Sequence, residues 1–456
     1  MPFALRSNCR VVVLGLGEAT VGPYEAYGNA SRRATMTVVG QTQVVYTYDN
    51  ANRLTNIQQG TSKIVIGYDD ADRRTSITYP NTNSITYGYN VASELTSLTY
   101  KQGATTLGDL TYTYDAAGNR IKTGGTFARS NLPPALTTTN YNANNHQLTF
   151  GTTTETYDLN GNLATTTDSG VTTTYTWNTR NQLTGISKTG FTASFTYDSF
   201  GRRTGKTING TTTNFFYDGL NPVQEKNGAT VTANLLTGLG IDEFFTRTDG
   251  VGVRSLLPDV LGSTVSLGDG TGTLQTQYTY EPFGFTTQTG LASTNSYKYT
   301  GREDDGSGLM YYRARYYHPR IQRFIAEDPL RFRGRDVNFF AYALNNPTNW
   351  TDASGTGPVG MGGALACAAI DIYDAYNTFK RLGKLSDDIN ALNTIIRPLE
   401  VRRLSGKGTD QDVERLRELQ LEGLRKSAEL TEGQLKAYIP NIALFFICAA
   451  LGLLPF

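Results

Sequence analysis

The phrase YTYDNANRLTNI (Tyr46–Ile57) returns with small changes through the first half of the chain. Its copies are IGYDDADRRTSI from Ile66, YGYNVASELTSL from Tyr87, YTYDAAGNRIKT from Tyr112, YTWNTRNQLTGI from Tyr175 and FTYDSFGRRTGK from Phe195. An anchor aromatic recurs roughly every 20 residues, and its clearest copies are Tyr48, Tyr68, Tyr114 and Tyr197. Self-similarity with this period predicts an array of stacked units rather than a set of unrelated domains.

Each unit predicts a strand, a turn and a second strand. Aromatic and threonine residues alternate in Tyr46-Thr47-Tyr48, which is the two-residue period of a half-buried strand. An Asp or Asn follows, as at Asp49, and its side chain can bond the backbone two residues on and start a turn. A glycine such as Gly118 then supplies the positive φ that the turn needs. Successive hairpins are expected to form one continuing antiparallel sheet with the anchor rings along one face.

The composition excludes several classes of protein. Lys plus Arg is 41 and Asp plus Glu is 40, so the net charge of +1 gives no electrostatic footprint for nucleic acid or an anionic membrane. The three cysteines, Cys9, Cys367 and Cys448, lie far apart, which argues against a disulfide framework and a Cys-rich zinc site. Because His146 and His318 are the only histidines, a two-His metal site is disfavoured, and we predict neither metal nor cofactor.

A second stretch, YKYTGREDDGSGLMYYRARYYHPRIQRFIAEDP (Tyr297–Pro329), separates the repeats from a tail of different composition. Its arginines are interleaved with tyrosines and with several acidic residues. This pattern favours buried packing of arginine against carboxylates and aromatic rings over binding of single-stranded nucleic acid. The residues expected to form this structural core are Arg302, Arg313, Arg315, Tyr316, Tyr317, Arg323 and Pro329.

The repeats resemble the YD repeats of the Rhs family, which includes the TcC-type toxin-complex subunits and, more distantly, the teneurin shell. The segment LLPDVLGSTVSLGDGTGTLQTQYTYEPFG (Leu256–Gly284) resembles a family segment that ends in Y-x-Y-x-P-F-G. Tyr297–Pro329 resembles the Rhs repeat-associated core, and Asn345-Asn346-Pro347 resembles the N-N-P that closes it. The resemblance covers roughly residues 24 to 357.

The resemblance implies a hollow shell with the core stretch turned inward and a variable C-terminal segment, often a toxin, held inside as cargo. It also implies that an aspartate pair frees this segment by self-cleavage, since two carboxylates held close can share a proton. The corresponding residues here are Asp328 and Asp352, with the scissile bond between Thr356 and Gly357, and Asp336 is a further candidate. Around these positions the sequence departs from the family's D-P-x-G-L pattern.

We therefore predict four regions: an N-terminal extension (1–23), a YD-repeat β-sheet array (24–255), an Rhs repeat-associated core (256–357) and a variable, toxin-like helical segment (358–456). In the tail, apolar residues recur with a helical period. Two apolar pieces, Met361–Ile372 and Asn441–Phe456, are shorter than the roughly 20 residues that span a bilayer. A small helical bundle is the first interpretation, and a short hairpin that contacts a membrane is the second.

The predicted fold is thus mainly β, an antiparallel sheet of hairpins curling into a shell, followed by a small α-helical domain. The predicted function is a carrier for a C-terminal effector in bacterial competition, with an immunity protein and a secretion system or an N-terminal shell as partners. We expect a secreted or cell-surface protein, although the N-terminus lacks the small-residue cleavage site of a signal peptide. The alternatives are an adhesive or carbohydrate-binding surface array and a truncated Rhs fragment; neither is a conventional enzyme.

Overall fold

The computed structural model describes residues 24–28, 32–136 and 138–360, and these residues are mainly β. Every strand pair in these ranges is antiparallel, which confirms the predicted fold class for the repeats. No helix in this part of the chain is long and apolar enough to span a membrane. The predicted tail helices, and the membrane contact considered for them, lie outside the described residues.

The repeats form two sheets, which together we call the wall. The first is 10-stranded and runs in sequence order. Its strands are β1 (Tyr24–Tyr27), β2 (Arg33–Thr37), β3 (Val44–Tyr48), β4 (Leu54–Gln59), β5 (Ser62–Tyr68), β6 (Arg74–Thr78), β7 (Asn83–Tyr89), β8 (Leu95–Gln102), β9 (Thr105–Tyr114) and β10 (Arg120–Gly124).

The second sheet of the wall is 16-stranded and also runs in sequence order. Its strands are β11 (Thr139–Tyr141), β12 (Gln147–Phe150), β13 (Thr153–Tyr157), β14 (Leu163–Asp168), β15 (Val171–Trp177), β16 (Leu183–Lys188), β17 (Phe191–Tyr197), β18 (Arg203–Ile208), β19 (Thr211–Asp218), β20 (Asn221–Asn227), β21 (Thr230–Thr237), β22 (Phe244–Asp249), β23 (Gly252–Pro258), β24 (Thr264–Gly268), β25 (Leu274–Tyr280) and β26 (Thr286–Gly290).

The expectation of one continuing sheet was wrong, because hydrogen bonding stops after β10 and resumes at β11. The segment between them contains Pro133 and Pro134, which have no N–H to donate to a strand ladder. Part of this segment instead lies against the far end of the second sheet. Ser130 forms an isolated bridge with Tyr280, and the side chain of Asn131 donates to Thr287 at 3.2 Å.

The turns of the wall follow the predicted chemistry. The Asp49 carboxylate accepts from the backbone N–H of Ala51 at 3.0 Å and of Arg53 at 2.9 Å. The same pair of bonds recurs in the other repeats, for example at Asp69, Asp115, Asp158 and Asp198. The fourth turn residue has positive φ, 66° at Asn52 and 78° at Gly118. Each repeated Asp is therefore a structural residue of a hairpin turn.

The anchor aromatics tie each repeat to the one before it. The Tyr68 hydroxyl donates to the carbonyl of Leu54 at 3.1 Å, where the preceding return strand begins. The bonds from Tyr114 to the Leu95 carbonyl (2.7 Å) and from Tyr197 to the Leu183 carbonyl (2.6 Å) repeat this arrangement. Guanidinium groups lie over the anchor rings, as Arg32 does over Tyr48 and Arg53 over Tyr68. These contacts form the predicted ladder of rings.

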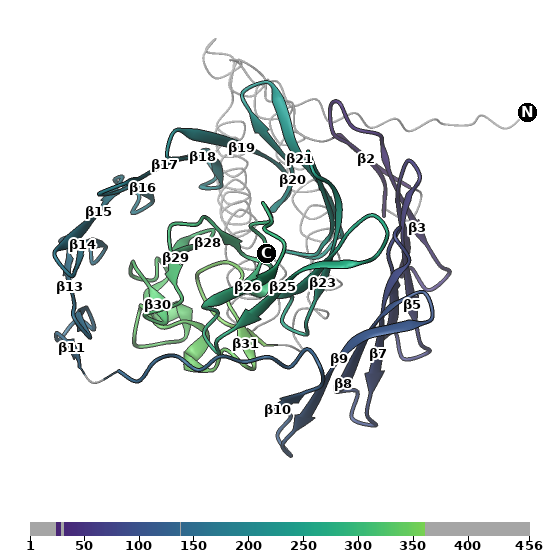
Figure 1. Cartoon of the computed structure of the whole chain (residues 1–456), viewed down its shortest axis with the longest axis horizontal. Helices are drawn as coiled ribbons and strands as arrows, with labels where there is room; N and C mark the ends of the chain where they lie inside the picture. The colour runs from purple at the N-terminus through teal and green to yellow at the C-terminus, as the bar shows by residue number, and fades with distance from the viewer. Residues whose placement is uncertain (1–23, 29–31, 137, 361–456) are drawn as a thin grey trace, which may run out of the picture.

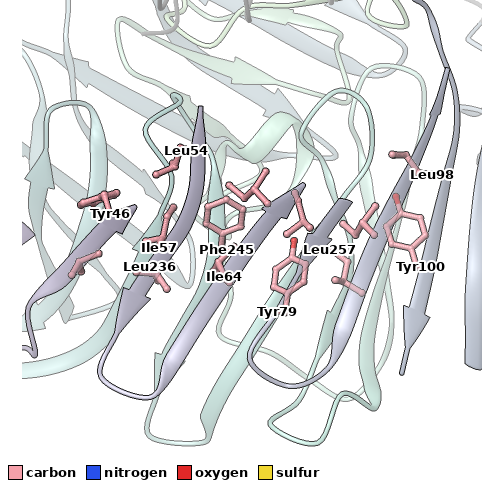
Figure 2. Packing of buried hydrophobic residues seen from close by; sticks show 14 of the residues in the cluster. Tyr46, Leu54, Ile57, Ile64, Tyr79, Leu98, Tyr100, Leu236, Phe245 and Leu257 are labelled. Carbon is pink, nitrogen blue, oxygen red and sulfur yellow. The ribbon is translucent and has the colours of Figure 1, made fainter. Parts of the chain in front are cut away.

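The second sheet turns back inside the first. Figure 1 shows β20–β26 lying along the inner face of the 10-stranded sheet, while β11–β19 curve away and enclose a central space. Buried side chains of the two layers face each other, including Ile57 and Ile64 from the first sheet and Leu236, Phe245 and Leu257 from the second (Figure 2). The inner face of the repeats is thus covered by later repeats of the same chain.

Residues 297–360, which we call the plug, fill the centre of the wall (Figure 1). Four buried aromatic residues, Tyr312, Tyr317, Phe324 and Tyr342, pack together as its core. Its elements are the 3₁₀ turns η1 (Tyr299–Gly301), η2 (Arg331–Gly334) and η3 (Ala343–Asn345) and the short strands β27 (Glu303–Asp304), β28 (Met310–Tyr312), β29 (Arg315–His318), β30 (Arg323–Phe324), β31 (Trp350–Thr351) and β32 (Val359–Gly360).

Candidate active site

The loop of residues 352–358 carries three of the predicted site residues, Asp352, Thr356 and Gly357. It is closed at its base by the pairing of β31 with β32, in which Trp350 lies opposite Gly360 and Thr351 opposite Val359. All three predicted residues are buried. The candidate scissile bond therefore lies inside the plug rather than on an exposed linker.

Asp352 holds this loop through its own backbone. Its Oδ1 accepts from the N–H of Thr356 at 3.0 Å, from the N–H of Gly357 at 3.1 Å and from the Ser354 hydroxyl at 3.1 Å. The Gly357 nitrogen is the leaving group if the Thr356–Gly357 bond is hydrolysed. A carboxylate is thus already in contact with the atom that would need a proton.

Arg315 joins the two candidate aspartates, which are 24 positions apart in the chain. One guanidinium nitrogen, Nη2, lies 3.0 Å from Asp328 Oδ2 and 3.4 Å from Asp352 Oδ2. The same guanidinium donates to the carbonyls of Gly355 and Phe339 and lies 3.7 Å from the centre of the Phe324 ring. Arg315 therefore fixes both carboxylates and the loop with one planar group.

The pKa values of both aspartates are raised. Burial is the largest cause for Asp328, the charge of Asp352 adds to it, Arg315 opposes it, and the resulting pKa is about 6. Burial also raises the pKa of Asp352, again against the opposing charge of Arg315. Two buried carboxyls with raised pKa values that share one cation can hold a proton near neutral pH.

A small cavity of about 10 Å³ lies beside Asp328, Asp352 and Gly357, which is the space for a single water. Gly334 of η2 also lines it. A β-carbon at Gly334 would overlap Asp328 Oδ2 and would lie 3.2 Å from the Thr356 carbonyl oxygen. Asp328 and the scissile carbonyl therefore approach each other across a gap that exists because residue 334 has no side chain.

The remaining predicted core residues lie elsewhere in the plug. Tyr316 and Tyr317 are buried, Asp336 lines the small cavity and Pro329 lines a larger one. Arg323 donates to the Asn145 carbonyl in the wall at 2.8 Å.

Two wall residues that bind the plug, Asp242 and Arg203, were missed by sequence reasoning. Arg302 and Arg313 both bind Asp242 of the wall, not the acidic residues next to them in the sequence. The fully buried Arg203 of β18 pairs with Glu303 at 2.6 Å and Asp305 at 2.5 Å. The role of Gly334 was also missed. A single glycine in a 3₁₀ turn carries no sequence signal, but Arg203 does stand at a repeat position that holds leucine in neighbouring repeats.

In the described ranges, no group of three or more His, Cys, Asp or Glu side chains is arranged to hold a metal ion. The polar groups next to the candidate scissile bond are the Asp328 and Asp352 carboxyls, the Arg315 guanidinium and the loop backbone.

A curled YD-repeat wall around a buried plug defines a YD shell. The profile of the teneurin YD-shell family matches residues 75–348, more than half of the chain, and the chain belongs to this family. Two curated relatives are toxin subunit YenC1 of Yersinia entomophaga, 35% identical over 111 residues (23% of this chain and 11% of the relative), and the tRNA nuclease WapA of Bacillus subtilis, 35% identical over 101 residues (21% and 4%). The chain thus spans only a small part of the relatives it matches.

Solved structures show the same fold. The Photorhabdus luminescens Tc holotoxin pore matches with a TM-score of 0.57 over 74% of this chain and 21% of the matched chain. A crystal structure of TcdB2-TccC3 matches with a TM-score of 0.55 over 73% and 22%. Both are 19% identical to this chain, so the likeness concerns the fold. These findings confirm the resemblance to Rhs and TcC-type proteins.

Replacing Asp328 by asparagine should stabilise the folded chain at pH 7.5 and leave its stability unchanged below pH 4. The pKa of Asp328 is about 6 in the folded chain and 3.8 when unfolded. The wild-type folded state is therefore destabilised as the pH rises from about 4 to above 6, because the buried carboxyl must ionise. At pH 7.5 the free energy of unfolding of Asp328→Asn should exceed that of the wild type by roughly 3 kcal/mol. Thermal and urea unfolding at both pH values measure it. The exposed wall-turn variant Asp72→Asn should stay within about 0.5 kcal/mol at both, and a destabilised Asp328→Asn at pH 7.5 would contradict the prediction.

Proposed function

We propose that this chain is the shell of a toxin-associated YD-repeat protein that encloses its C-terminal segment and frees it by hydrolysing its own Thr356–Gly357 bond. The observation that carries the cleavage is the contact of Asp352 Oδ1 with the Gly357 N–H at 3.1 Å, in a buried loop that Arg315 links to Asp328. The Rhs and TcC-type family relationship supports the shell.

The geometry supports a division of roles between the two carboxyls. Protonated Asp328 faces the Thr356 carbonyl oxygen across Gly334, gives it a proton as the carbonyl carbon is attacked, and takes that proton back when the tetrahedral intermediate collapses. Asp352 takes a proton from the attacking water and passes it to the Gly357 nitrogen as the C–N bond breaks. The water supplies its hydroxyl to the Thr356 carbonyl carbon and its proton to the new amine, so atoms and charge balance.

Arg315 acts as a positioning residue in this scheme. Its Nη2 holds both carboxyls and its Nε holds the Gly355 carbonyl in a fixed arrangement. Because these groups are already held in place, less entropy is lost on reaching the transition state than if a separate acid, base and water had to come together. The plug excludes bulk water, since both aspartates are buried.

The relatives support a toxin as the cargo. Toxin subunits and a tRNA nuclease are among the proteins that share these repeats. We accordingly propose that residues beyond the scissile bond are an effector, that the chain is exported from a bacterium and acts in competition between bacteria, and that its partners are other toxin or shell subunits and an immunity protein.

Purified full-length protein should separate into two polypeptides that divide between Thr356 and Gly357, as read by denaturing gel and intact mass spectrometry. Asp352→Asn and Asp328→Asn should each give one uncleaved chain, because each removes one of the two proton-transfer groups. Asp72→Asn, on an exposed turn of the wall, should cleave like the wild type. One intact chain from the wild-type sequence after prolonged incubation between pH 5 and 8 would rule out cleavage.

Gly334→Ala should slow cleavage on the order of a hundredfold, because its β-carbon displaces the Asp328 carboxylate from the Thr356 carbonyl. The φ of Gly334 lies outside the left-handed region, so alanine does not strain the backbone. Gly250→Ala is the matched control, since a β-carbon there meets nothing within 4 Å. Cleavage of Gly334→Ala at the wild-type rate would contradict the assigned placement of Asp328. It would not decide the role of Asp352.

Expression of residues 357–456 in a bacterial host should arrest growth if this segment is the effector. The full chain carrying Asp352→Asn should be tolerated, because the segment stays attached within its shell, and residues 24–356 should be tolerated as well. Viable counts after induction measure the effect. Growth of cells in which residues 357–456 accumulate in soluble form would show that this segment is not a toxin for that host.

A further inference from the structure

A second cavity of about 290 Å³ shares no lining residue with the cavity at the aspartates, although residues of the 352–358 loop line both. Turns of the wall form one side of it, through Phe200, Arg202 and Leu220. The plug forms the other, through Tyr311, Arg313 and Thr356. Its volume is near the lower end for sites that bind small molecules, which are typically about 300–1,000 Å³.

The cavity has an excess of positive charge. Arg302 and Arg313 both line it, and both pair with a single carboxylate, Asp242, at 2.5 Å and 2.7 Å. Among the described residues neither arginine has a second acidic partner. Glu303, the acidic residue of the lining, is already bound by Arg203 and Lys206. Within the described ranges the two guanidinium groups thus share one carboxylate, and a buried excess of positive charge is unfavourable unless an anion compensates it.

The pKa of Arg313 is lowered, first by burial and next by the positive charge of Arg302, while the charge of Asp242 and its hydrogen bond oppose the shift. Arg180 also lines the cavity and is exposed, and in the described chain it forms no ion pair. An anion entering from solvent would meet this guanidinium first.

The rest of the lining is largely aromatic. Phe244 and Tyr297 have ring centres 4.3 Å apart, and Tyr217 and Tyr311 complete the inner surface. Phe200 stands at the tip of a wall turn, and 82% of its surface is exposed. An aromatic ring is usually buried to a greater extent than this. Aromatic surfaces next to guanidinium groups suit a ligand that combines a flat apolar body with a negative charge.

We propose that this cavity binds a small organic anion with an aromatic body, its carboxylate paired with Arg313 and Arg302 and its ring placed between Tyr311 and Phe200. The two candidate aspartates do not line this cavity, although Thr356 of the candidate scissile bond does. Binding to it does not require that the chain cleave itself.

Phenylacetate and its neutral analogue phenylacetamide test the proposal by isothermal titration calorimetry on the full chain. Phenylacetate should bind saturably and at least about tenfold more tightly than phenylacetamide, because the amide cannot compensate the excess guanidinium charge. Ala314→Phe should abolish binding by filling the cavity from an exposed lining position without removing an ion pair. Phe332 is an exposed aromatic residue outside the cavity, and Phe332→Ala should bind phenylacetate like the wild type.

Three results would overturn the site: no saturable binding of phenylacetate up to about 10 mM, equal affinity for the acid and the amide, or unchanged binding by Ala314→Phe. Thermal unfolding of each variant verifies that the fold is retained. Because Asp352 does not itself line this cavity, the titration repeated with the uncleaved Asp352→Asn chain separates a failure of this site from a failure of the proposed cleavage.

Discussion

The constraint on which this structure depends is that the apolar inner face of a long antiparallel sheet needs a second layer to cover it. The repeats meet this need with their own later copies. Leu236, Phe245 and Leu257 of the second sheet cover Ile57 and Ile64 of the first, so the sheet is rolled rather than flat. The remaining inner surface, along β11–β19, is covered by the plug.

Coverage by the plug brings charge into the interior, and the charges are matched across the interface. Arg203 of the wall lies over the Tyr311 ring at 4.2 Å and pairs with Glu303 and Asp305 of the plug. Buried pairs of this kind add little net stability, but removing one partner leaves a costly unpaired charge. They therefore set the position of the plug within the wall, and with it the positions of the candidate aspartates.

Sequence reasoning predicted the repeat unit and put Asp328 and Asp352 forward as candidates, but it did not predict their surroundings. The turn chemistry of Asp49 and Gly118 is local, so four or five consecutive residues suffice to predict it. The approach of Asp328 to Asp352 depends on Arg315 and Gly334, which become neighbours only when β29, η2 and the β31–β32 loop are packed together. The break between β10 and β11 was missed because the repeat pattern alone contains no measure of where ladder pairing stops.

The sequence by itself determined the hairpin array, its anchor rings and the position of an acidic pair behind it, because period, turn residues and motif order are all properties of neighbouring residues. The tertiary structure alone decided how the sheet rolls, which wall carboxylate receives Arg302 and Arg313, and that the 352–358 loop is buried. These features join residues far apart in the chain. Burial and charge pairing select such contacts only in the folded state, and no local pattern encodes them.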